Sequence, residues 1–233
     1  MRVGLLHTVP GLAPVFDPIV RTTFANDVKV VHLVAAELLA LALADDPRVA
    51  PATNEAARAL AGLGCEAILV TCSSIGEIAV AEAKSLPVPV LRVDEPIARE
   101  AARLVAAAGS AARVILLATQ PSTLGPSGRL LTKAIIAAGG SGSQVEAVLV
   151  KGAAEALAAG KHDEHDRLLR ESATSAIKAA PEAAVIALAQ ASMVAAFDGV
   201  NLSVPVLTSP HSGVKALAAL DAAPNVTRAG AAQ

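Results

Sequence analysis

The sequence predicts an α/β protein with two pseudo-symmetric lobes, each a mostly parallel sheet flanked by helices, and a cleft between the lobes. Three observations support this prediction. Eight short runs rich in Val, Leu and Ile are almost free of polar residues, as expected of parallel strands covered on both faces. Ala-rich helical segments alternate with these runs. Three stretches of the first half also recur in the second half in the same order.

The expected strands fall into two sets. The first set is 2–8, 29–34, 66–71 and 88–93, and the second set is 112–119, 145–150, 184–189 and 204–208. Helices are expected over 33–44, 54–62, 163–178 and 213–222. The first of these helices is apolar enough to be buried, and Thr53 and Asn54 are possible caps of the second.

The repeated stretches place the boundary between the lobes. RVGLLHTVP at 2–10 matches RVILLATQP at 113–121, EAILVTCSS at 66–74 parallels AAVIALAQAS at 183–192, and VPVLRVDEP at 88–96 parallels VPVLTSPHS at 204–212. The first lobe is therefore expected to comprise 1–95 and the second 96–212. The C-terminal segment 213–233 is expected to join the first lobe.

Polar loops follow the expected strands at the ends where open parallel sheets bind their ligands. These loops are HTVPG, TCSSIG, TQPSTLGPSG and AQASM. They contain hydroxyl, thiol and amide groups and few charges, and the helix starts that follow them suit a carboxylate or another small anion. The candidate substrate-binding residues are Thr8, Ser73, Ser74, Thr119, Gln120, Thr123, Ala191 and Ser192.

These residues resemble the aspartate/glutamate racemase superfamily, which includes hydantoin racemases, maleate isomerases and arylmalonate decarboxylases. The resemblance covers nearly the whole chain. It rests on the two lobes, on VTCSS at 70–74, on ALAQASM at 187–193 and on the segment 152–169. It implies a small carboxylate substrate and chemistry without a cofactor or a metal. Members of this superfamily often form homo-oligomers.

In the racemases of this family, a cysteine from each lobe faces one side of the substrate α-carbon. By motif match, Cys72 is the first-lobe cysteine, and the second-lobe position falls on Gln190. An amide has no proton to exchange near neutral pH, so Gln190 can only form hydrogen bonds. This departure argues against racemisation by two thiols. His211, in a loop after the last expected strand, and His7 are the candidates for a substitute proton shuttle.

Three reaction types are consistent with a single thiol. Racemisation requires a second base, decarboxylation requires one proton donor, and isomerisation of an unsaturated diacid requires one nucleophilic thiol. The family favours an isomerase of the racemase type, with a decarboxylase as the second choice. The alternative is a non-catalytic protein that binds a small carboxylate on the same fold.

Composition excludes several other functions. The net charge is −2, with no Trp, no Tyr and no basic run, so no nucleic-acid partner is expected. The sequence predicts neither a signal peptide nor a membrane span.

Cys65 and Cys72 fit neither a disulfide framework nor a usual zinc pattern, which favours a cytoplasmic location. Cys65 is expected to pack in the core. GGSGS at 139–143 precedes a strand rather than a helix and is therefore no dinucleotide-binding fingerprint.

Overall fold

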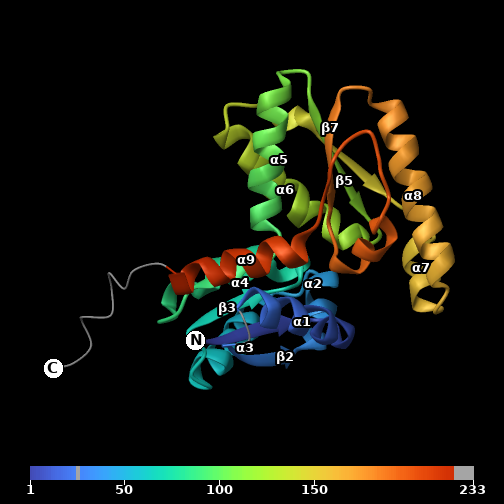
Figure 1. Cartoon of the computed structure of the whole chain (residues 1–233). Helices are drawn as coiled ribbons and strands as arrows, with labels where there is room; N and C mark the ends of the chain where they lie inside the picture. The colour runs from blue at the N-terminus through green and yellow to red at the C-terminus, as the bar shows by residue number, and fades with distance from the viewer. Residues whose placement is uncertain (25–26, 223–233) are drawn as a thin grey trace.

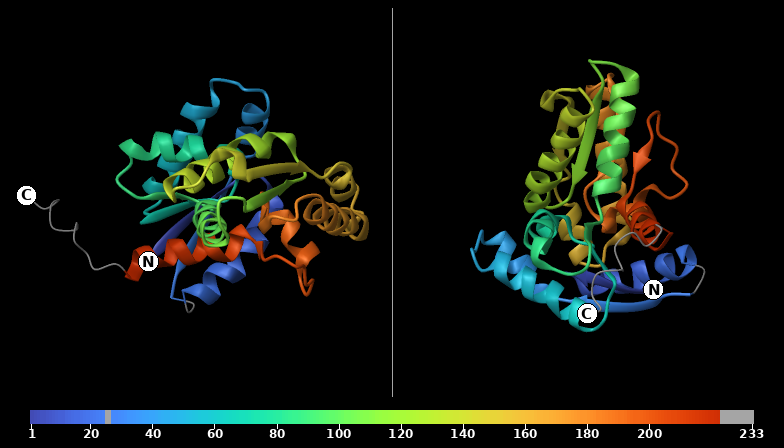
Figure 2. Two further views of the ribbon diagram at one scale, coloured as in Figure 1. Left: turned by 90° about the horizontal axis from the view of Figure 1, so that it is seen from above. Right: turned by 90° about the vertical axis from the view of Figure 1, so that its left-hand side faces the viewer.

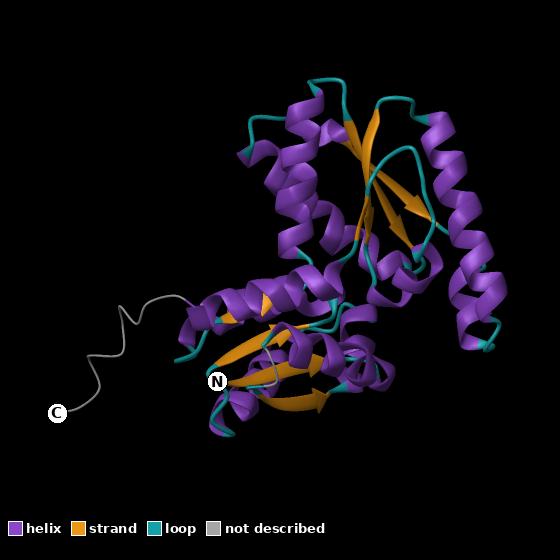
Figure 3. Ribbon diagram, in the orientation of Figure 1, coloured by secondary structure: helices purple, strands orange, loops and turns teal. Residues whose placement is uncertain are grey.

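The chain forms two four-stranded parallel sheets with helices on both faces of each sheet (Figures 1 and 3). The structure is a computed structural model that describes residues 1–24 and 27–222. The strand orders are β2-β1-β3-β4 and β6-β5-β7-β8, so each strand of the first sheet has an equivalent at the same place in the second. The predicted α/β fold with two pseudo-symmetric lobes is confirmed.

The strands of the first sheet and most of the helices around it come from the first 92 residues. The strands are β1 (Arg2–His7), β2 (Lys29–Val34), β3 (Ala67–Val70) and β4 (Val90–Arg92). The helices are α1 (Ala13–Thr23), α2 (Ala36–Leu43), α3 (Val49–Gly62) and α4 (Ser73–Glu82), with 3-10 turns η1 (Pro10–Leu12) and η2 (Ala83–Ser85).

The second half repeats this arrangement. The strands are β5 (Arg113–Ala118), β6 (Val145–Leu149), β7 (Ala183–Leu188) and β8 (Val206–Leu207). The helices are α5 (Glu95–Ala108), α6 (Pro121–Ala137), α7 (Ala153–Ala158), α8 (His162–Ala179) and α9 (Ser209–Ala222), with 3-10 turns η3 (Gly142–Gln144) and η4 (Ala191–Phe197). Each of the eight expected strands is present at its predicted place, shorter by at most a few residues at its ends.

The last helix after each sheet packs on the other lobe. After β4, the helix α5 leaves the first sheet and contributes Ala101 and Val105 to a core cluster of the second lobe. After β8, the helix α9 returns and contributes Val214 and Leu217 to a core cluster of the first lobe, beside Phe16. Figures 1 and 2 show α9 lying along the first lobe. This exchange of helices means that neither lobe has a complete core without the other half of the chain.

The helix α9 begins earlier than expected. It starts at Ser209 rather than at residue 213, and Pro210 is accommodated because the first turn of a helix needs no backbone N–H at that place. Residues 223–233 of the predicted C-terminal segment lie outside the described residues.

The chain crosses between the lobes twice, once between β4 and α5 and once at the start of α9. These two crossing segments touch each other at Gly213. A Cβ atom on Gly213 of α9 would lie 2.7 Å from Val93 Cγ2 and 2.9 Å from the Val93 carbonyl oxygen, in the segment between β4 and α5. Beside Val93, Arg92 and Asp94 form a buried two-point ion pair, with Nε–Oδ1 at 2.7 Å and Nη2–Oδ2 at 2.8 Å. The two segments are thus closely packed, and the charges of Arg92 and Asp94 neutralise each other there.

The helix α3 differs from the prediction. It begins at Val49, so Thr53 and Asn54 lie inside the helix and do not cap it. Instead, the Asp46 carboxylate accepts the backbone N–H of Arg48 at 2.9 Å, just before the helix. Pro51 lies in the first turn, where a missing N–H costs no hydrogen bond. The Thr53 hydroxyl is consequently buried without a partner among the described residues.

The apolar stretch 33–44 is not one buried helix. Its first two residues finish β2, and in α2 the only buried side chain is Leu38. No helix within residues 1–24 and 27–222 is long and apolar enough to cross a membrane.

We predict that Gly213→Ala destabilises the protein by about 1–3 kcal/mol, because the added methyl group meets the Val93 backbone at the crossing. Gly62→Ala is the matched control, since Gly62 is also helical and its Cβ would meet nothing within 4 Å. Urea unfolding of the three proteins measures the difference. Equal stability of the two variants would contradict the close packing described for the crossing.

Candidate functional site

A cavity of about 340 Å³ lies where the carboxyl ends of the strands of both lobes converge. Its polar lining comes from the loops after β1, β3, β5 and β7 and from the start of α9. These polar residues are Thr8, Thr71, Cys72, Ser73, Ser74, Thr119, Gln120, Ser122, Thr123, Gln190, Ser192 and Ser209. Among the described residues that line the cavity, none is charged, and Cys72 is the only one with a titratable side chain.

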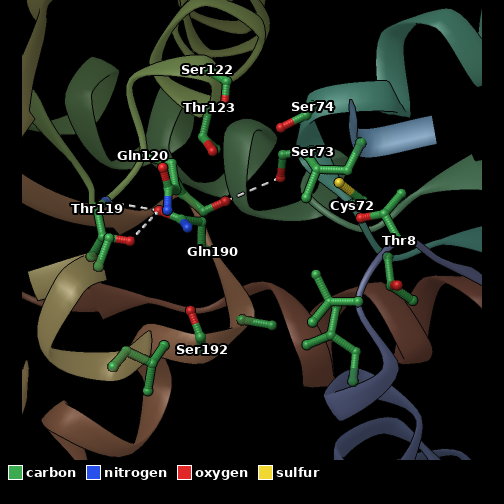
Figure 4. A pocket seen from close by; sticks show the side chains of 18 of the residues that line it. Thr8, Cys72, Ser73, Ser74, Thr119, Gln120, Ser122, Thr123, Gln190 and Ser192 are labelled. Carbon is green, nitrogen blue, oxygen red and sulfur yellow. Dashed lines mark hydrogen bonds between the residues drawn. The ribbon is translucent and has the colours of Figure 1, made fainter. Parts of the chain in front are cut away.

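Cys72 lies at the junction of β3 and α4. It is the N-cap residue of α4, with extended backbone angles and no side-chain hydrogen bond to the helix start. The partly buried thiol lines the cavity at the positive end of the helix dipole (Figure 4). Cys65, in contrast, is 2% exposed in the core of the first lobe, and burial raises the pKa of its thiol. The predicted packing role of Cys65 is confirmed.

The strand ends of the two lobes are directly connected beside Cys72. The Ser73 hydroxyl donates to the Ala189 carbonyl oxygen at 3.1 Å, which links the start of α4 to the residue after β7 (Figure 4). Near this link, α4 packs on α6 of the other lobe, where Arg129 and Lys133 pair with Glu77. Ser73 is therefore committed to holding the lobes together, whereas the Ser74 side chain is directed into the cavity.

Gln190 lies at the position in the second lobe that corresponds to Cys72. It follows β7 by two residues, as Cys72 follows β3, and it is the N-cap residue of η4. Its Oε1 accepts the Thr119 backbone N–H at 2.8 Å and the Thr119 hydroxyl at 3.1 Å (Figure 4). Because a backbone N–H can only donate, the amide oxygen must face Thr119. The Nε2 end of Gln190 then remains free of partners among the described residues, at the cavity.

Thr8 and Thr119 occupy equivalent positions, each directly after an inner strand of its sheet. Their hydrogen bonding differs. The Thr119 hydroxyl is bound to Gln190, whereas the Thr8 hydroxyl is buried without a partner among the described residues. Thr8 is only 2% exposed and lines the cavity on the Cys72 side (Figure 4). A buried polar atom without a partner is costly, so a ligand group that bonds to it gains affinity.

A chain of hydrogen bonds lies behind Cys72 in the first lobe. His7 Nδ1 bonds the Thr71 hydroxyl at 2.8 Å, His7 Nε2 bonds His32 Nδ1 at 2.9 Å, and His32 Nε2 lies 3.3 Å from Asp17 Oδ1. Arg21 donates to Asp17 and lowers the pKa of that carboxyl. The Thr71 hydroxyl also donates to the Leu6 carbonyl oxygen at 3.1 Å, which ties this chain of hydrogen bonds to the backbone of β1.

Among the described residues, the second lobe has no such chain of hydrogen bonds. The positions equivalent to His7 and Thr71 are Ala118 and Ala189, at the ends of β5 and β7. His32 pairs with Leu5 of β1, and the corresponding Leu116 of β5 pairs with Ala147. The strand ends next to Cys72 thus carry polar side chains, whereas the equivalent positions next to Gln190 are alanines. Sequence patterns did not predict this chain, because its members are separated by up to 64 residues.

The remaining candidates divide into two groups. Gln120, Thr123, Ala191 and Ser192 line the cavity. His211 does not line it and is an exposed residue of the first turn of α9. Ser209, which sequence patterns missed, takes its place at the cavity. His7 is completely buried and touches Thr71 rather than the cavity. Neither histidine therefore reaches the cavity as a substitute for the second thiol.

No group of three or more His, Cys, Asp and Glu side chains within residues 1–24 and 27–222 is arranged to hold a metal ion.

We predict that His7 makes stability depend on pH. Burial, with a smaller contribution from His32, lowers the pKa of His7 from 6.5 to about 4, so the unfolded chain binds a proton that the folded chain does not. The stabilisation is complete above pH 6.5 and is lost as the pH falls toward 4, by at most about 3 kcal/mol. Urea unfolding at several pH values should show a shallower pH dependence for His7→Leu than for the parent.

The control His162→Leu, at a surface position, should keep the pH dependence of the parent. If the free energy of unfolding of His7→Leu changed with pH in parallel with that of the parent, His7 would not be the source of the pH dependence.

Comparisons with known proteins agree with the geometry. Residues 18–217 match the model of the Asp/Glu/hydantoin racemase family. No curated protein sequence matches the chain. Among solved structures, the allantoin racemase from Klebsiella pneumoniae is 16% identical with a TM-score of 0.67, covering 95% of this chain and 88% of its own. The aspartate racemase from Picrophilus torridus is 14% identical with a TM-score of 0.67, covering 95% and 94%.

The glutamate racemase from Aquifex pyrophilus is also similar in structure. It is 16% identical with a TM-score of 0.65, and the match covers 94% of this chain and 84% of that chain. At these identities, the similarity to solved structures supports the fold, and the match to the family model supports the assignment of the sequence. The chain therefore belongs to the Asp/Glu/hydantoin racemase family.

Proposed function

We propose that the protein is a cofactor-independent enzyme of the racemase type that moves a proton at the carbon next to the carboxylate of a small acid. Cys72 is the proposed acid/base residue. One observation carries this proposal: Cys72 has the only titratable side chain among the described residues that line the cavity between the lobes. A reaction that transfers protons inside this cavity therefore depends on the thiol.

The proposed step transfers one proton and needs only groups that are present at the site. The Cys72 thiolate takes the α-proton, the C–H bond breaks, and its electron pair moves into an enolate that extends over the substrate carboxylate. The starts of α4, α6 and η4 all face the cavity, and no side chain caps the first turn of any of them. Their backbone N–H groups and the Thr8 hydroxyl can stabilise the enolate charge. Return of the proton from the Cys72 thiol restores the C–H bond.

Gln190 limits what happens on the other face of the substrate. Its amide can donate hydrogen bonds but cannot supply or remove a proton. We therefore expect Cys72 to exchange the α-proton on one face faster than the protein inverts the configuration. Decarboxylation is the second candidate, because a single thiol suffices to protonate the enolate after carbon dioxide leaves. A protein that only binds the carboxylate is the non-catalytic alternative. The lack of a second acid/base residue among the described residues that line the cavity favours it.

We predict that the protein incorporates deuterium at the α-carbon of a small acid or a 5-substituted hydantoin in deuterated water, and that Cys72→Ser abolishes this incorporation. Proton NMR of the α-position measures the exchange. Cys65→Ser is the matched control, because Cys65 lies in the core, outside the cavity. A Cys72→Ser protein that exchanges as fast as the parent would refute the role of the thiol, and binding without any exchange would favour the non-catalytic alternative.

A further inference from the structure

The cavity combines polar loops and helix starts with aliphatic walls. Besides the polar loops, its lining includes aliphatic side chains from η1, α2 and α7, namely Leu12, Leu39, Leu43, Ala154, Leu157 and Ala158. Leu43 is 56% exposed and Val9, also in the lining, is 43% exposed. Large aliphatic side chains at the opening of a cavity are the surface that an apolar group of a ligand covers with a gain in free energy.

Thr8 and Thr119 are equivalent residues of the cavity, and only Thr8 has a hydroxyl that is free to bind a ligand among the described residues. On the second lobe, the Gln190 amide oxygen already takes both the N–H and the hydroxyl of Thr119. A ligand carboxylate would have to displace that oxygen to reach these donors. On the first lobe, the buried Thr8 hydroxyl has no partner among the described residues and remains available beside Cys72.

From these two observations we infer that the substrate is a small acid with a single anionic group and an apolar side group, and that Gln190 is a specificity-determining residue that excludes dicarboxylates. This inference rests on the proposed function in taking the cavity as the substrate site. The anionic group binds at the Thr8 side, next to Cys72. The side group lies against the leucines of α2 and α7.

A second carboxylate would meet unfavourable surroundings. The described lining holds no Lys, Arg or His to pair with it, and the Thr119 donors are occupied. Burying an ionised carboxylate without a charged partner costs several kcal/mol. Acids with a charged side group, as in aspartate and glutamate, should therefore bind poorly. The free Nε2 of Gln190 adds donors that suit a neutral carbonyl oxygen of the ligand.

Isovalerate and succinate are simple probes of this inference, since they share a small size and differ in the second charge. Their binding is measured by the slowing of Cys72 alkylation by iodoacetamide and by calorimetry, neither of which requires turnover. We expect isovalerate to give half-maximal protection at a concentration at least about tenfold below that of succinate. Equal or stronger protection by succinate, or no protection by isovalerate, would overturn the inference.

Gln190→Ala tests the proposed role of the amide. Removing it frees the Thr119 N–H and hydroxyl, so binding of succinate relative to isovalerate should improve by about tenfold. Adding Thr119→Val should reverse much of this gain. Asn201→Ala removes an exposed amide outside the cavity lining, and it should leave the ratio near that of the parent. An unchanged ratio in a folded Gln190→Ala protein would refute the specificity role.

The outcomes separate this inference from the proposed function. Preferential binding of isovalerate without α-proton exchange in any acid would support the substrate class and count against the enzyme. Cys72-dependent exchange in aspartate or glutamate, at rates matching acids with apolar side groups, would support the enzyme and overturn the substrate class.

Discussion

The cavity exists because two stretches of chain cross between the lobes at one place. Gly213 lies against the backbone of Val93 there, and the buried pair of Arg92 and Asp94 adjoins the same crossing. Each crossing delivers a helix that completes the core of the opposite lobe. The lobes are consequently held in a fixed relation, and the ends of β3 and β7 come close enough for Ser73 to bond the Ala189 carbonyl. The geometry of the site depends on this constraint.

The two lobes share a backbone plan and differ in the chemistry of their strand ends. In the first lobe, a thiol is underlain by Thr71, His7 and His32, which are linked to the charged Asp17. In the second lobe, the equivalent underlying residues are alanines. Burying the polar chain requires every member to be hydrogen-bonded, which fixes ring orientations and the position of the strand end before Cys72. The proposed acid/base function therefore belongs to one half of a pseudo-symmetric scaffold.

Sequence patterns predicted the strands, the lobes and much of the cavity, because these follow from local hydrophobic runs and from the repeat. The cavity lining of Cys72, Thr8 and Gln190 follows from one rule, that ligands bind at the carboxyl ends of parallel strands. Long-range pairing lay beyond that rule. The bond between Gln190 and Thr119 joins residues 71 apart, and no local pattern indicates it. His211 was misleading because its loop has suitable chemistry, whereas its place in the first turn of α9 leaves it exposed.

The central claim is that proton transfer is possible from the Cys72 side and not from the Gln190 side. Its most direct test is to incubate a single enantiomer of a turned-over acid in deuterated water and to follow deuterium in each enantiomer separately. The account predicts that the starting enantiomer gains α-deuterium well before the opposite enantiomer accumulates. Formation of the deuterated opposite enantiomer with no deuterium in the remaining starting material would show that two bases act on opposite faces, and would contradict the account.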